Sequence, residues 1–96
     1  MVLLWHWRSL KKNEFVDIGL VLFPHFHFLI VPTLHVASLK DCDDSHQALL
    51  GSALLLAPKL AAQQGLVGFK TLINTGREGG QEVFHLHVHV FGGGAV

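Results

Sequence analysis

The segment 82–91 alternates between polar and apolar side chains with a period of two. The two sets are histidines and aliphatic residues: His85, His87 and His89 against Leu86, Val88 and Val90. Because successive side chains of a β-strand point to opposite faces, this alternation predicts a strand with one histidine face and one apolar face. The apolar face needs a second layer over it, which restricts the chain to a sheet with one buried side.

A helix is the expected second layer. Asp43 or Asp44 is a suitable N-cap, and Gln47 stands three residues after Asp44, as in a weak capping box. Gly65 is expected to end the helix, and Pro58 to kink it, because proline removes one backbone donor. Residues at three- and four-residue spacing are expected to form its apolar face: Leu49, Leu50, Ala53, Leu54, Ala57, Leu60 and Ala61.

Two shorter strands are expected to extend the sheet. Residues 26–31 are a short aromatic and β-branched run that Pro32 closes, which is typical of a buried strand. Residues 69–73 predict another strand, and the glycine-containing segment 74–81 predicts a loop. Residues 1–17 show no clear period and receive no assignment. Because a chain of 96 residues suffices for one small domain, residues 1–96 are expected to form a single one.

The composition excludes several classes of partner. Seven basic residues balance seven acidic ones and are scattered, so long nucleic acid is not an expected partner. The apolar stretch 18–31 is shorter than the roughly 20 residues of a membrane-spanning helix. Residues 1–12 carry their positive charges after the apolar residues, the reverse of a secretory signal. Cys42 is the single cysteine and cannot form an internal disulfide, so a cytoplasmic location is expected.

Three interpretations of the histidine face stay open on the residues alone. Histidine has a modest strand preference, so packing alone is a poor explanation of three at a period of two. A zinc site is a second possibility, with His-x-His as ligands and His25 or His27 as a third. However, His85 and His89 would lie about 13 Å apart along a strand, which makes two ligands easier than three.

A phosphate site is the third interpretation. Gly79, Gly80 and Gln81 precede the histidines, and bare backbone N–H groups in such a loop bind anions without a charged side chain. A hairpin loop that needs positive φ explains the two glycines equally well. The adjacency of loop and histidines favours the phosphate interpretation.

The run from Gly79 to Gly93 resembles the signature of the histidine-triad (HIT) superfamily, especially its Hint-like nucleotide-binding branch. The resemblance covers about residues 26–93, and the segment 15–18 also resembles the family's Phe-x-Asp-Ile motif. It implies an α+β, HIT-like fold in which one main helix packs on a meandering antiparallel sheet, usually in a homodimer. It further implies binding of purine nucleoside monophosphates or their conjugates and hydrolysis of phosphoramidate bonds, with no metal and no cofactor.

The resemblance also implies roles for individual residues. His87 corresponds to the nucleophile and would form a nucleotidyl-histidine intermediate, which His85, His89 and His27 would support by positioning and proton transfer. Five residues would hold the phosphate: Asn74, Gly80, Gln81 and the N–H groups of Glu82 and Val83. Three residues would hold the nucleoside: Asp17 at the ribose, and Phe15 and Ile18 at the base.

Two alternatives to this hydrolase are kept. The first is a nucleotide-binding or regulatory module of the same fold without efficient turnover. The second is a His-x-His zinc-binding protein.

Overall fold

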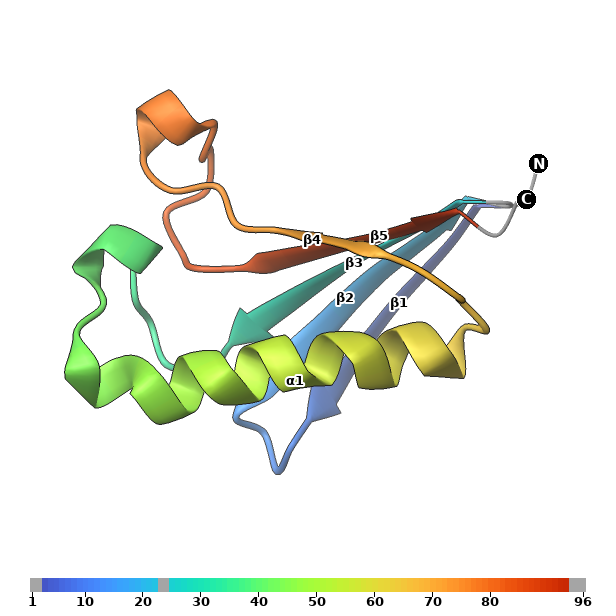
Figure 1. The fold of residues 1–96 in the computed structure, drawn as a ribbon, viewed down its shortest axis with the longest axis horizontal. Helices are drawn as coiled ribbons and strands as arrows, with labels where there is room; N and C mark the ends of the chain where they lie inside the picture. The colour runs from blue at the N-terminus through green and yellow to red at the C-terminus, as the bar shows by residue number, and fades with distance from the viewer. Residues whose placement is uncertain (1–2, 23–24, 94–96) are drawn as a thin grey trace.

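The computed structural model describes residues 3–22 and 25–93. Within them, five antiparallel strands form one sheet in the order β1-β2-β3-β5-β4, and one long helix packs on it (Figure 1). The main elements are β1 (Leu3–Leu10), β2 (Phe15–Leu22), β3 (His25–Pro32), α1 (Gln47–Gln63), β4 (Lys70–Leu72) and β5 (Val88–Gly93). The expected α+β architecture, a meandering antiparallel sheet with one main helix, is therefore confirmed. That residues 1–96 form a single domain stays a prediction.

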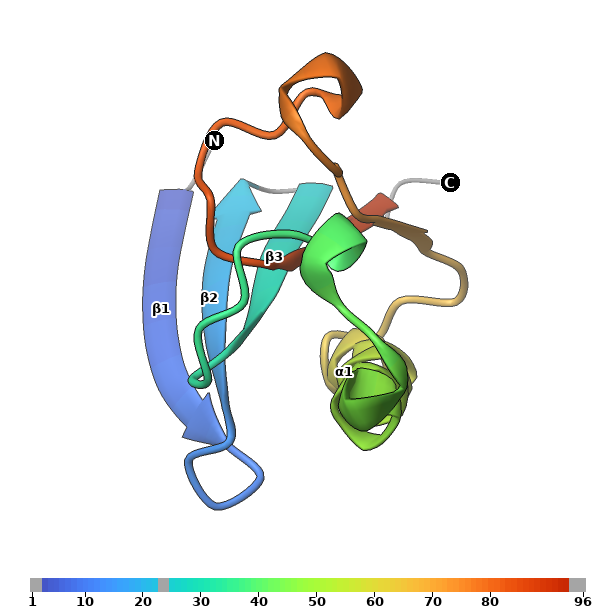
Figure 2. The same ribbon diagram turned by 90° about the vertical axis from the view of Figure 1, so that its left-hand side faces the viewer.

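The core lies between α1 and one face of the sheet, as the view in Figure 2 shows. Its buried residues come from three strands and the helix: Phe15, Phe28, Ile30, Ala53, Ala57, Leu60, Val88 and Val90. Alanines at the centre of the helix face let α1 approach the sheet closely. Leu54, expected on this face, is instead 48 % exposed, because the buried stripe is centred on Ala53 and Ala57.

The ends of α1 follow the sequence signals with one correction. The Asp43 side chain accepts from the Ser45 N–H (2.9 Å), but the reciprocal acceptor for the Asp43 N–H is His46 Nδ1 (3.0 Å), not Gln47. A short 3-10 turn, Asp44–His46, precedes the helix and makes His46 the third residue after the cap.

The helix ends as predicted at Gly65, whose φ of 73° suits glycine. The Leu66 N–H bonds to the Ala61 carbonyl and the Gly65 N–H to the Ala62 carbonyl, which is a Schellman motif. Pro58 does not interrupt the helix, which continues to Gln63.

Residues 3–10, left unassigned from the sequence, form strand β1. It pairs with β2 so that Arg8 lies opposite Asp17. The turn between the strands holds Lys11, Lys12 and Asn13 at positive φ. The sequence did not reveal this strand, because its residues show no regular alternation. The strand forms through its pairing with β2.

Strand β5 begins at Val88 rather than at Glu82. The last pair that it forms with β3 is Ile30↔Val88, although β3 continues to Pro32. Before Val88, the Leu86 N–H reaches the Val36 carbonyl (2.7 Å), and residues 82–87 otherwise run as an irregular segment. The burial still alternates there, since Leu86 is buried and His85 and His87 are half-buried. Within residues 3–22 and 25–93, no helix is long and apolar enough to cross a membrane.

Candidate active site

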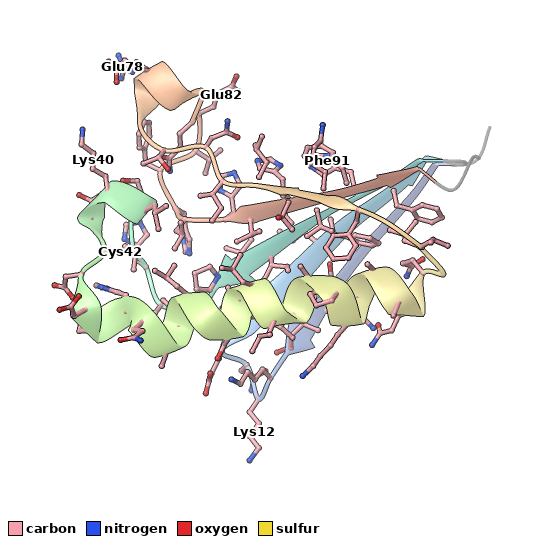
Figure 3. The ribbon with its side chains drawn as sticks, in the orientation of Figure 1. Lys12, Lys40, Cys42, Glu78, Glu82 and Phe91 are labelled. Atoms are coloured by element: carbon pink, nitrogen blue, oxygen red, sulfur yellow. The ribbon has the colours of Figure 1, made fainter. Side chains whose placement is uncertain are left out.

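The predicted histidines gather on the face of the sheet that α1 does not cover. The pairing of β3 with β5 sets Leu29 opposite His89 and His27 opposite Phe91. Because the neighbouring residues Val88 and Val90 are buried under the helix, His89 and Phe91 project from the other face. Figure 3 shows Phe91 on the side of the sheet away from α1.

His27 and His89 form a hydrogen-bonded pair. Nε2 of His27 lies 2.9 Å from Nδ1 of His89, so one nitrogen donates and the other accepts. Burial lowers the pKa of His27 from its ordinary value of 6.5. Burial, followed by the charges of His87 and His27, lowers the pKa of His89 in the same way. Because both pKa values are lowered, the neutral form of each ring predominates near pH 7.

His87 has one ring nitrogen fixed and the other available. Its Nδ1 lies 2.7 Å from the carbonyl oxygen of His85, and a carbonyl can only accept, so Nδ1 carries the proton. In the neutral form of this tautomer the lone pair is on Nε2, which is the state that a nucleophile needs. The ring of His89 packs edge-on against His87, with centroids 4.9 Å apart.

His85 is anchored away from the strand ladder. Its Nε2 donates to the Pro32 carbonyl (2.7 Å) at the end of β3. The ring of His35 packs edge-on against it at 4.9 Å, and Nε2 of His35 donates to the Phe84 carbonyl (3.1 Å). Sequence reasoning missed His35, because nothing in its spacing shows that the chain after β3 returns to the histidine segment.

Two pockets meet at His87. A polar pocket of about 340 Å³ is lined by Asn74, Gly80, Gln81, Glu82, Val83, His87 and His89. A largely apolar groove of about 280 Å³ is lined by Ile18, Leu29, Val31, Val83, His85 and His87. Val83 and His87 line both, so His87 lies where the polar pocket and the apolar groove adjoin.

Among the described residues, the backbone N–H groups that are free to bind a phosphate are not the three that the glycine pattern predicted. The N–H groups of Gly79, Gly80 and Gln81, expected to be bare, bond to carbonyls of Gly76 and Arg77 within the loop. The next two N–H groups along the chain, those of Glu82 and Val83, make no hydrogen bond within the part of the chain that the structure describes.

The side chains of Gln81 and Asn74 are also engaged within the protein. The buried amide of Gln81 donates to the Ala37 (2.7 Å) and Val83 (3.0 Å) carbonyls and accepts from the Gly76 N–H (2.9 Å). Nδ2 of Asn74 donates to the Gly79 carbonyl (2.8 Å). Both side chains therefore shape the loop, and Gln81 has no donor left for a phosphate.

The predicted nucleoside residues divide between the two faces of β2. Ile18 lines the apolar groove, but Asp17 and Phe15 are fully buried on the side of α1. The Asp17 carboxylate accepts from Nε of Arg8 (3.0 Å), whose Nη2 also donates to Gln63 of the helix (2.6 Å). The structure does not bring Asp17 or Phe15 to the histidines, because adjacent strand residues face opposite ways.

A zinc site with three protein ligands would need a cluster of metal-binding side chains. Among the described residues, no group of three or more His, Cys, Asp or Glu side chains is arranged to hold a metal ion. His25 was one of the two residues expected as a third ligand. Its side chain is not among those that the structure describes.

The comparison with known proteins decides the family. The family described as "HIT domain" matches residues 23–96. The chain belongs to the HIT family. The predicted superfamily is thereby confirmed.

Two curated relatives illustrate the similarity of this HIT chain. It is 54 % identical over 67 residues to Protein HitA of Neisseria gonorrhoeae, covering 69 % of this chain and 63 % of that protein. It is 39 % identical over 69 residues to the purine nucleoside phosphoramidase of Escherichia coli K12, covering 70 % and 58 %. The chain thus spans about three fifths of the length of these relatives.

Solved structures agree in fold. A HIT family hydrolase from Legionella pneumophila superposes with a TM-score of 0.74 at 29 % identity, covering 100 % of this chain and 85 % of that one. A histidine triad protein from Clostridium difficile superposes with a TM-score of 0.79 at 27 % identity, covering 100 % and 84 %.

Proposed function

We propose that this HIT protein is a purine nucleotide-binding hydrolase that cleaves the phosphoramidate bond of nucleoside monophosphate conjugates. The observation that carries the proposal is the state of His87. Its Nδ1 donates to the His85 carbonyl, which in the neutral ring leaves the lone pair on Nε2, and His87 lines both the polar pocket and the apolar groove. The similarity to a purine nucleoside phosphoramidase supports the same reaction class.

The two pockets suit the two ends of a nucleotide. Ile18, Leu29 and Val31 give the groove an apolar lining for a purine base. The unpartnered N–H groups of Glu82 and Val83 are suitable donors to the α-phosphate oxygens as charge builds on them. Asn74, Gly80 and Gln81 would form the wall of the phosphate pocket rather than its donors.

In the first step, Nε2 of His87 attacks phosphorus and the bond from phosphorus to the leaving nitrogen breaks. The leaving nitrogen takes the Nε2 proton of His89, the proton on Nε2 of His27 moves to Nδ1 of His89, and solvent protonates Nδ1 of His27, so that both rings stay neutral. The product amine departs, and the nucleotide stays on His87 as an imidazolium, which the bond from Nδ1 to the His85 carbonyl stabilises.

In the second step, water attacks phosphorus and the bond to Nε2 of His87 breaks. One proton of the water passes to Nε2 of His89, the relay through His27 runs in reverse and returns a proton to solvent, and the nucleoside monophosphate is released. No metal and no cofactor takes part in this proposal.

A homodimer belongs to the proposal. Strand β4 is an edge of the sheet, and its last residue, Leu72, is exposed, as are Leu54 and Leu55 on the helix. Exposed apolar side chains at an unpaired edge are typical of a surface that a second copy covers. We place the protein in the cytoplasm, because its single cysteine cannot form an internal disulfide.

One observation favours the second candidate, a nucleotide-binding module without turnover. Asp17, the expected ribose acceptor, is buried against Arg8 and does not reach the groove. A nucleotide held only by its base and phosphate binds less tightly and is positioned less well for attack.

Release of a fluorescent amine from an adenosine phosphoramidate tests the proposal, with wild type compared with His87→Ala in the presence of a chelator. The proposal predicts chelator-resistant turnover that His87→Ala abolishes. The matched control is His46→Ala, which removes a histidine of the helix cap and should retain turnover.

The other outcomes separate the alternatives. AMP binding without turnover in wild type would replace the hydrolase by the binding module. Turnover that the chelator abolishes would favour the zinc protein, and full turnover in His87→Ala would end the proposal.

A further inference from the structure

Phe91 stands at the centre of a row of side chains that crosses the sheet. Its partner on β3 is His27, and its partner on β4 is Lys70. On its own strand, His89 is two residues earlier and therefore shares its face. Phe91 thus has a histidine beside it on one neighbouring strand, a histidine before it on its own strand, and a lysine on the other neighbouring strand.

The rings of these residues are stacked. The Phe91 and His27 centroids are 4.3 Å apart with 24° between the ring planes. The Phe91 and His89 centroids are 5.6 Å apart, and their planes differ by only 6°. Nζ of Lys70 lies 5.5 Å from the centre of the Phe91 ring, within the range of a cation–π contact.

This stack determines how the two histidines meet. A short bond between Nε2 of His27 and Nδ1 of His89 needs both rings held in orientation, and a single aromatic ring touches both of them. An aromatic ring also excludes water from the surface that it covers, which disfavours a charged imidazole. The charged or titratable groups around the pair are His87 on the same segment, Lys70 on β4, and Glu82, which lines the pocket with His89.

We propose that Phe91 is a positioning residue whose ring holds His27 and His89 as a stacked, hydrogen-bonded pair and shields it from water. Lys70 completes the unit by its contact with the same ring. The effect on turnover rests on the proposed hydrolase, whereas the effect on the histidines does not.

The test measures the imidazole titrations of His27 and His89 by two-dimensional NMR in wild type, Phe91→Leu and Phe91→Ala. In wild type both groups should titrate below the ordinary value of about 6.5. In Phe91→Ala both pKa values should rise toward that value, because the ring no longer excludes water. Phe91→Leu keeps apolar bulk and should give a smaller rise, and it serves as the test variant if Phe91→Ala does not fold.

Kinetics supply the second measurement. With an adenosine phosphoramidate, kcat of Phe91→Ala should fall about threefold at pH 6, and KM should change by less than about twofold. The acidic limb of the kcat profile should move to higher pH. Phe84→Ala, which removes a ring that is 45 % exposed and lies outside the stack of Phe91, His27 and His89, is the matched control and should leave both titrations unchanged.

Unchanged titrations in folded Phe91→Ala and Phe91→Leu would overturn the proposal. So would an equal shift in Phe84→Ala, since the effect would then not come from the stack. If the titrations move as expected and wild type cleaves no phosphoramidate, the positioning role stands and the hydrolase proposal fails.

Discussion

Strands β5 and β2 follow the same alternation, yet they distribute their candidate residues differently. On β5 and the segment before it, every second residue is a histidine, and the residues between them are buried aliphatics. On β2, Asp17 and Ile18 are neighbours, so only Ile18 reaches the groove, and Asp17 is buried with Arg8. An alternating sequence reveals the position of a site only when the residues on the two faces of the strand differ in chemistry. A motif of adjacent residues cannot supply two ligands to one face of a regular strand.

The largest expected effect is the loss of stability on replacing Asp17. Asp17→Asn keeps the shape but removes the ion pair with Arg8, which is 44 % exposed, so we expect a loss of about 2 kcal/mol in the free energy of unfolding. Because Asp17 lies on the helix side, AMP affinity should stay within about twofold. Urea unfolding and calorimetric titration measure the two effects. A stable Asp17→Asn protein with strongly reduced AMP affinity would place Asp17 at the ribose and contradict the observed face.

The neighbouring residue should show the opposite behaviour. Ile18→Ser exposes a polar group in the apolar groove, so we expect KM for an adenosine phosphoramidate to rise about fivefold to tenfold with a smaller change in stability. Steady-state kinetics check this, with Val16→Ser as the control on the same face of the same strand. Equal KM values for Ile18→Ser and wild type would remove the base from this groove.

The histidine face should make stability depend on pH in a defined direction. The pKa values of His27 and His89 are lowered in the folded protein, so the unfolded chain binds protons first as the pH falls through about 6.5. The free energy of unfolding should therefore be flat above that pH and decrease below it, until the folded histidines also titrate. Asp43, whose pKa is lowered from 3.8 chiefly by its bond to Ser45, acts only at still lower pH.

Urea unfolding at several pH values between 8 and 5 measures this dependence. The double variant His27→Gln and His89→Gln should show a shallower decrease than wild type. An identical decrease in the two proteins would mean that the pair does not cause it.

The smallest effect concerns the turn that leads into β2. Lys12 adopts a φ of 54°, which glycine adopts at lower cost than lysine. Lys12→Gly should therefore stabilise the protein by about 0.5 kcal/mol, the gain in the turn being partly offset by the greater freedom of the unfolded chain. Chemical denaturation detects a change of this size, and Lys59→Gly on the exposed side of α1 should have the opposite sign.

The sequence predicted those parts of the fold in which local signals agree with packing. The histidine alternation, the Asp43 cap and the Gly65 end of the helix were all predicted. The N-terminal strand could not be predicted, because its definition comes from pairing with β2. The start of β5 was placed too early, because the alternation continues into residues where the Leu86 N–H bonds to the Val36 carbonyl instead of to β3.

The candidate site also contains a part that the sequence predicted and a part that it did not. The histidines and the loop before them are local in sequence and were predicted as a group. The contacts that complete the site come from elsewhere in the chain: His35 packs on His85, and the Ala37 carbonyl fixes the Gln81 side chain. Such contacts depend on where the chain goes after β3, which no local period encodes.

The central claim is that His87 becomes covalently attached to the nucleotide. We would mix the protein with an adenosine phosphoramidate, quench within milliseconds under conditions that preserve phosphorus–nitrogen bonds, and map the modified peptide by mass spectrometry. The account predicts an adenylyl group on His87 in wild type, accumulating further in a variant that slows the second step, and none in His87→Ala. Turnover with no adenylyl group on His87, or with the group on another residue, would contradict the account.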